Sequence, residues 1–182
     1  MTQATSDELE AGLVHVRAAP REMGVVRLIV RRPGVDRREV VDEAELDVGL
    51  GLVGDDWVNR GSRATADGSP ARYAQVTLMN ARYAALIAGP PSGWGQAGDQ
   101  LYVDLDLSTE NLPAGAELAV GSAVLRISQE PHTGCAKFSG RFGSAALRLA
   151  NSPEGRALRL RGVNAMVVTS GTVRTGDAAR KV

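Results

Sequence analysis

The sequence predicts a mainly β protein, a mixed β-barrel with a few short helices. Short β-branched segments recur along the chain, and clusters of Gly, Pro, Asp and Asn separate them. Helix start and stop signals are sparse by comparison. At 182 residues the chain has the size of one domain with its own hydrophobic core.

The expected strands follow one another from residue 25 onward. Residues 25–30 read Val-Val-Arg-Leu-Ile-Val and end at the turn sequence Arg31-Arg32-Pro33-Gly34. Further strands are expected at 73–78, 101–105, 123–127 and 163–169. Ser170-Gly171 then predicts a tight turn into 172–174, so that the C-terminus forms a hairpin.

Two helices are predicted between these strands. Asn80 can cap a helix over 81–88 that Gly89 and Pro90 terminate, and Ser144 precedes a second helix over 145–150. The Gly- and Pro-rich residues 89–95 are expected as a long loop, either a surface excursion near the site or a connection across the barrel's end. Residues 1–22 are polar and Ala-rich, and are expected as a short helix or a loose leader ahead of the domain at 23–182.

Composition and charge narrow the function classes. Lys plus Arg and Asp plus Glu both total 21, so the formal net charge is zero, which argues against a general nucleic-acid binder. No apolar run approaches the length of a membrane span, and no secretory signal is visible. The single cysteine cannot form an internal disulfide. We therefore expect a cytoplasmic protein.

Familiar nucleotide and zinc motifs do not apply. Residues 49–54 match G-x-G-x-x-G, but the segment that follows is not a helix, so a turn or strand bend is predicted there. The adjacent Asp55-Asp56 is interpreted as a pair of solvated turn residues. One cysteine and two distant histidines, His15 and His132, do not supply a structural zinc site.

The segment around Cys135 is chemically distinctive. It reads Pro-His-Thr-Gly-Cys-Ala-Lys-Phe over 131–138 and follows a predicted strand. A thiol becomes a nucleophile or metal ligand as thiolate, which neighbouring cations such as His132 and Lys137 favour. The alternative is a small buried hydrophobic residue. The surrounding Pro, His, Gly and Lys favour function.

The segment from Arg126 to Arg161, which contains Cys135, is predominantly basic. Between Arg126 and Arg161 lie seven basic residues and two acidic ones, a local charge of +5. This segment suits an anionic ligand such as a phosphate. Alternatively, its arginines are solvated or paired with the acidic run at 39–56.

Five short blocks follow one another along the chain. They are Gly-Leu-Val-Gly-Asp at 51–55, Asp-Leu-Ser-Thr-Glu-Asn-Leu at 106–112, Pro-His-Thr-Gly-Cys at 131–135, Gly-Val-Asn-Ala at 162–165 and Gly-Thr-Val-Arg-Thr-Gly-Asp at 171–177. In this order they resemble the MOSC domain, the C-terminal domain of molybdenum-cofactor sulfurases. The resemblance implies a MOSC-like β-barrel that binds the molybdenum cofactor, a pterin with a dithiolene and a phosphate. Thr109 departs from the family's usual glycine, which leaves the backbone path of that block open.

The resemblance also implies site residues. Cys135 would be the catalytic residue, as the carrier of a persulfide sulfur or as the molybdenum ligand. The cofactor-binding residues expected around it are His132, Thr133, Lys137, Ser108, Asn111, Arg161 and Asn164. Glu110 would lie on the rim of the pocket, and Gly176-Asp177 would form a closing turn.

Three functions remain open at this point. The leading hypothesis is a molybdenum-cofactor-binding protein whose cysteine carries sulfur or ligates the metal. The alternatives are a molybdenum-dependent reductase of N-hydroxylated compounds and a non-catalytic module that binds an anionic small molecule. A sulfur carrier would need a separate cysteine desulfurase, and a reductase would need a separate electron-donor protein.

Overall fold

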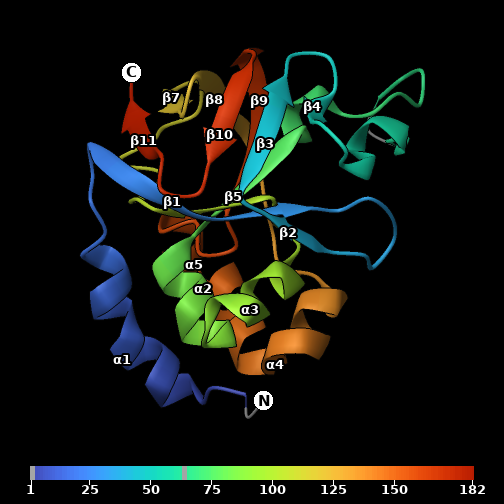
Figure 1. Ribbon diagram of the computed structural model, residues 1–182. Helices are drawn as coiled ribbons and strands as arrows, with labels where there is room; N and C mark the ends of the chain where they lie inside the picture. The colour runs from blue at the N-terminus through green and yellow to red at the C-terminus, as the bar shows by residue number, and fades with distance from the viewer. Residues whose placement is uncertain (1–2, 63–64) are drawn as a thin grey trace.

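Seven strands close into a barrel in a computed structural model that describes residues 3–62 and 65–182 (Figure 1). Around the barrel the order is β11, β7, β8, β9, β5, β6 and β1, and β1 pairs with β11 to complete the circle. Their bounds are β1 (Met23–Arg31), β5 (Val76–Asn80), β6 (Leu101–Asp104), β7 (Glu117–Val120), β8 (Ala123–Pro131), β9 (Val163–Thr169) and β11 (Ala178–Lys181). The predicted fold class, a mixed β-barrel with a few short helices, is confirmed.

The barrel is mixed because β5 and β6 run parallel, whereas its other neighbouring strands are antiparallel. Parallel neighbours need a crossover connection. Here the crossover consists of α2 (Ala81–Ala88), α3 (Pro91–Trp94) and the 3-10 helix η3 (Gly95–Ala97). Asn80 caps α2, accepting hydrogen bonds from the backbone N–H groups of Arg82 and Tyr83, so this predicted helix is confirmed.

The remaining strands extend or flank the barrel. β2 (Glu39–Val41) pairs with β1, and β10 (Gly171–Arg174), β3 (Glu43–Asp47) and β4 (Gly51–Leu52) form a separate three-stranded sheet. The predicted C-terminal hairpin is wrong, because β10 pairs with β3 rather than with β9. The turn at Ser170 carries the chain from one sheet to the other.

Alternating side chains divide the hydrophobic core into two parts. In β1, Val26 and Ile29 belong to the barrel interior, while Leu28 and Val30 belong to the cluster shared with the helices. β5 divides in the same way, with Leu78 inside and Met79 toward the helices. Strands covered on both faces are buried along their whole length, as β5 is.

The helices gather at one end of the barrel, below it in Figure 1. α1 (Ser6–Arg17) begins with a capping box between Thr5 and Glu8, so the helical alternative is the one observed over these twelve residues. Its apolar face packs into the helical cluster. α4 (Ala136–Asn151) begins nine residues before the predicted helix and bends at Gly143, whose φ is 91°. α5 (Pro153–Ala157) follows.

Residues 89–95 are not the long loop that their Gly and Pro content predicts. α3 and η3 form there because Pro91 occupies a first-turn position of α3, where a missing N–H costs no hydrogen bond. Trp94 is buried against Tyr102, with ring centroids 5.8 Å apart, and its backbone carbonyl accepts from the Tyr102 hydroxyl. No helix within residues 3–62 and 65–182 is long and apolar enough to cross a membrane.

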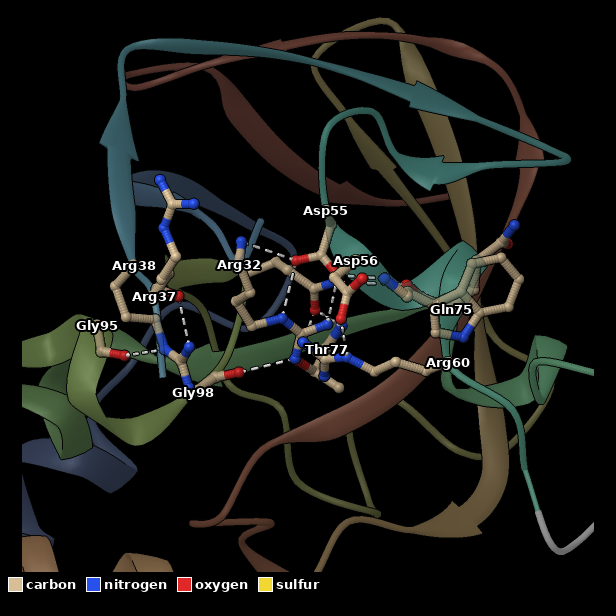
Figure 2. A network of polar contacts seen from close by, with 12 residues as sticks. Arg32, Arg37, Arg38, Asp55, Asp56, Arg60, Gln75, Thr77, Gly95 and Gly98 are labelled. Carbon is tan, nitrogen blue, oxygen red and sulfur yellow. Dashed lines mark hydrogen bonds and ion pairs between the residues drawn. The ribbon is translucent and has the colours of Figure 1, made fainter. Parts of the chain in front are cut away.

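The glycine-rich segment at 49–54 forms a strand and turn, as predicted, but Asp55 is not solvated. Its side chain is fully buried and binds Arg32 through both oxygens, with distances of 2.8 Å from Nε and 3.0 Å from Nη2 (Figure 2). Asp55 also accepts from the N–H groups of Arg32 and Trp57. Neighbouring Asp56 pairs with Arg60 nearer the surface. The interpretation of Asp55 as a solvated turn residue is therefore wrong.

The buried pair predicts a large difference between two adjacent aspartates. Asp55→Asn leaves the Arg32 guanidinium without its counter-charge, and should lower the free energy of unfolding by about 3–5 kcal/mol. Asp56→Asn, the matched control, should cost much less because its partner Arg60 is solvated. Urea denaturation of both variants measures this, and equal losses would show that the Asp55 pair is not stabilising.

Candidate functional site

Cys135 lies between the end of β8 and the start of α4. It is exposed and occupies the position directly before the first residue of the helix. The loop at 132–134 is fixed by Asn151, whose Oδ1 accepts from the Gly134 N–H at 3.0 Å and whose Nδ2 donates to the Gly134 carbonyl at 3.3 Å. The expected position of the thiol, in a loop that follows a strand, is observed.

The surroundings of Cys135 favour the thiolate. The backbone N–H of Phe138 lowers the pKa of the thiol most, and the N–H of Lys137 and the charges of Arg161 and Arg141 contribute in the same direction. Burial opposes them. Lys137 therefore acts through its backbone, while its ammonium lies 3.4 Å from a carboxylate oxygen of Asp36. The effect on the thiol that the sequence assigns to Lys137 is therefore seen through its backbone N–H.

His132 also differs from the expected cation. Burial, together with the charge of Arg161, lowers its pKa to about 4, and Asp99 opposes this effect only in part. The imidazole is therefore neutral at neutral pH. The prediction that His132 tunes the thiol as a nearby cation is wrong.

Arg161 connects the thiol region to the barrel. Its Nη1 lies 2.6 Å from Oδ2 of the fully buried Asp99, and its guanidinium carbon lies 5.2 Å from the centre of the Phe138 ring in the first turn of α4. The next residue, Gly162, has a φ of 104°, and a Cβ there would lie 2.4 Å from the carbonyl oxygen of Leu78. Only glycine allows the chain to pass so close to β5.

Arginines from separate segments bind four consecutive carbonyls at the turn before β6. The acceptors are the carbonyls of Gly95, Gln96, Ala97 and Gly98, and the donors in the same order are Arg38, Arg141, Arg161 and Arg32. Figure 2 shows the contacts of Arg38 and Arg32. Burial and then the charges of Arg141 and Arg32 lower the pKa of Arg38. The turn at 95–98 thus fixes four arginines, of which Arg161 and Arg141 act electrostatically on Cys135.

A cavity of about 240 Å³ lies where β8 ends and β9 begins. Its lining includes ten polar or charged residues, Thr109, Ser128, Gln129, Glu130, His132, Thr133, Arg156, Arg159, Arg161 and Asn164. Four of the predicted cofactor-binding residues therefore converge here, whereas Cys135, Lys137, Ser108 and Asn111 are not among the lining residues. A larger hollow of about 580 Å³ between α1, α4 and α5 contains none of the predicted site residues.

Ser108 and Asn111 are buried within the fold. Asn111 Nδ2 donates to the carbonyls of Arg21 and Asp106, both at 2.8 Å, and the Ser108 hydroxyl accepts from the Asn111 N–H at 3.2 Å. These bonds fix the path of the loop at 106–112. Thr109, which replaces the glycine of the MOSC block, lines the cavity instead.

The basic side chains between Arg126 and Arg161 lie partly in the cavity lining and partly in ion pairs elsewhere. Arg126 pairs with Glu117, and Lys137 and Arg141 pair with Asp36, so these cations are not paired with the acidic run at 39–56 as the alternative proposed. The cavity-lining arginines come from the end of the segment, at 156–161.

Sequence reasoning missed the position of Arg156 and Arg159, although both belong to the basic segment it identified. It also missed Asp99, which no local pattern distinguishes. Within residues 3–62 and 65–182, no three His, Cys, Asp or Glu side chains are grouped as metal ligands.

Solved structures share this fold. YuaD from Bacillus subtilis superimposes with a TM-score of 0.62 at 19% identity, over 86% of this chain and 94% of the other. YiiM from Escherichia coli gives 0.54 at 19% identity, over 87% and 69%, and YiiM from Geobacillus stearothermophilus gives 0.52 at 16%, over 90% and 74%. No protein-family model and no curated protein matches the chain. Together with the closed mixed barrel, these similarities support a MOSC-like fold.

The setting of Cys135 predicts a reactive thiol. Its alkylation rate should rise with pH through a midpoint below the value of about 8.5 for a free cysteine, because backbone N–H groups and arginines stabilise the thiolate. The chain has one thiol, so the rate reports Cys135 alone, and the urea-unfolded protein is the control. A native thiol that resists alkylation until unfolding would exclude this role.

Proposed function

We propose that the protein binds the molybdenum cofactor and that Cys135 carries a persulfide sulfur for it or ligates its molybdenum. The observation that carries the proposal is the exposed Cys135, whose pKa is lowered by backbone N–H groups and by Arg161 and Arg141. A thiolate is both a sulfur nucleophile and a soft metal ligand. The MOSC-like fold and the five sequence blocks supply the class of cofactor.

The cavity offers groups that fit the anionic end of such a cofactor. Arg156 is exposed, and no ion pair of its side chain is found among the described residues. Arg159 donates Nη1 to the backbone carbonyls of Leu107 and Leu112, which places its guanidinium at the cavity wall. About 240 Å³ is below the usual 300–1,000 Å³ of small-molecule sites, so the cavity suits a phosphate rather than a whole pterin. Bound there, the cofactor would supply the metal and dithiolene chemistry.

As a sulfur carrier, Cys135 would act by thiolate attack. Its sulfur would bond to the outer sulfur of a persulfide on a separate donor, such as a cysteine desulfurase, and the donor cysteine would leave as thiolate. As a metal ligand in a reductase of N-hydroxylated compounds, it would need electrons from a separate protein. Both versions use the same thiol.

The second candidate function is a module that binds an anionic small molecule without using the thiol. One observation favours it: Cys135 does not line the cavity that contains Arg156, Arg159 and Arg161. In that case the ligand would occupy the cavity alone, and replacing Cys135 would not affect binding.

Retention of molybdopterin with its metal distinguishes the two functions. Purified protein is incubated with the cofactor released from a molybdoenzyme, and bound molybdenum and pterin are measured after gel filtration. Cys135→Ser should lose most of the bound molybdenum while its thermal unfolding stays unchanged, because the exposed side chain contributes little packing. Arg156→Gln should weaken pterin retention about 10-fold through loss of one charge-assisted hydrogen bond.

Arg126→Gln is the matched control, since Arg126 belongs to the same basic segment but pairs with Glu117 away from the cavity. Its retention should equal that of the wild type. Retention that survives Cys135→Ser and falls with Arg156→Gln would favour the anion-binding module. No retention by the wild type would contradict the proposed function.

A further inference from the structure

A buried carboxylate stands behind the cavity. Asp99 has no exposed surface, and it faces two partners that both line the cavity. Its Oδ2 lies 2.6 Å from Arg161 Nη1, and its Oδ1 lies 3.4 Å from His132 Nδ1. Asp99 therefore joins the charged wall of the cavity to its imidazole.

The contact with His132 determines where the ring carries its proton. Within the described chain, Asp99 Oδ1 and His132 Nδ1 are both buried and neither makes a hydrogen bond, so the 3.4 Å contact joins two unpaired polar atoms. An ionised carboxylate only accepts hydrogen bonds, so the facing ring nitrogen must carry the hydrogen. Because the ring is neutral, Nε2 is then without hydrogen and accepts. At 3.4 Å the two atoms lie close enough for an ion pair but do not form a hydrogen bond.

We propose that Asp99 is a positioning residue that holds His132 with hydrogen on Nδ1, so that Nε2 accepts a hydrogen bond from a ligand in the cavity. The ligand class follows from the neighbouring groups: an anion that also carries its own O–H or N–H donor, such as a protonated phosphate. This inference rests on the proposed function, because it takes the cavity as the ligand site.

The charges around His132 agree with such a ligand. Arg161 and Arg32 act on the ring electrostatically together with Asp99, and Arg156 and Arg159 line the same cavity. Glu130 also lines it, and the Glu130 carbonyl accepts from Asn164 Nδ2 at 3.1 Å. The arginines favour negative charge, whereas a bare Nε2 repels an anion oxygen that has no hydrogen. The cavity should therefore bind an anion that carries a hydrogen more tightly than an anion that carries none.

The tautomer is testable without any ligand. Nitrogen-15 NMR of the imidazoles reports which ring nitrogen carries hydrogen, and His15, exposed on α1, is an internal control in the same spectrum. His132 should carry it on Nδ1 in the wild type. In Asp99→Asn the amide oxygen remains with Arg161 and the NH₂ group faces Nδ1, so the hydrogen should move to Nε2, as in catalytic triads with the same change.

Inorganic phosphate and sulfate test the ligand class. Near pH 6 phosphate groups retain a hydrogen on part of their oxygens, whereas sulfate has none. The wild type should bind phosphate about 10-fold more tightly than sulfate, as one hydrogen bond predicts. Asp99→Asn and His132→Gln should both lose this preference, and Arg156→Gln should weaken both anions while keeping it. Titrations followed by calorimetry give the four ratios.

The outcomes separate this inference from the proposed function. An Nε2–H tautomer in the wild type, or equal affinity for the two anions, would overturn the inference without affecting molybdenum retention on Cys135. If Asp99→Asn fails to fold, His132→Gln tests the same preference with Asp99 and Arg161 intact. A phosphate preference that persists in His132→Gln would also overturn the inference.

Discussion

The Asp99 carboxylate is the constraint on which the candidate site depends. It is fully buried, and a charge in that position is stable only with a close counter-charge, which Arg161 provides at 2.6 Å. With Arg161 fixed in this way, its guanidinium supports the Phe138 ring at the start of α4 and thereby the segment that carries Cys135. His132 faces the other carboxylate oxygen and is held in the cavity wall. One buried charge thus orders both the cavity and the thiol region.

The topology of the barrel explains why these groups meet. The parallel pair β5 and β6 requires a crossover, and the crossover ends in the turn at 95–98 just before Asp99. The Gly95 carbonyl accepts from the Gly98 N–H, and the helix does not continue to supply N–H partners for the carbonyls of Gln96, Ala97 and Gly98. Arginines from distant segments bind all four carbonyls. Two of the arginines that bind these carbonyls, Arg161 and Arg141, also lower the pKa of the Cys135 thiol through their positive charge.

Sequence reasoning succeeded where structure depends on local signals. Asn80 and Gly89 delimit α2, and the β-branched run at 163–169 coincides with β9. It also placed Cys135 correctly at the end of a strand. Sequence reasoning failed where the environment of a residue depends on contacts with distant segments of the chain. The local sequence around Asp55 is typical of a solvated turn, and only the fold shows that Asp55 is buried against Arg32. No local sequence pattern indicates that Asp99 is buried against Arg161.

The charge state of a side chain also depends on contacts that the sequence does not show. A histidine three residues before a cysteine suggests a cation that favours the thiolate, but burial and the charge of Arg161 keep His132 neutral. Likewise, Ser108 and Asn111 match a family block, yet their hydrogen bonds hold the loop at 106–112 together. Neither outcome could be derived without knowing which segments pack together.

The most direct test of this account is the pH dependence of stability in the wild type and in His132→Gln. A folded-state pKa of about 4, below the unfolded value of about 6.5, gives stability that is full above pH 6.5 and is lost as pH falls toward 4. Relative to the variant, the wild type should lose about 3 kcal/mol at most over this range, measured by urea unfolding. His15→Gln should follow the wild type, because His15 is exposed. A difference between wild type and His132→Gln that stays constant from pH 7 to 4 would contradict a neutral, partly buried His132 held by Asp99.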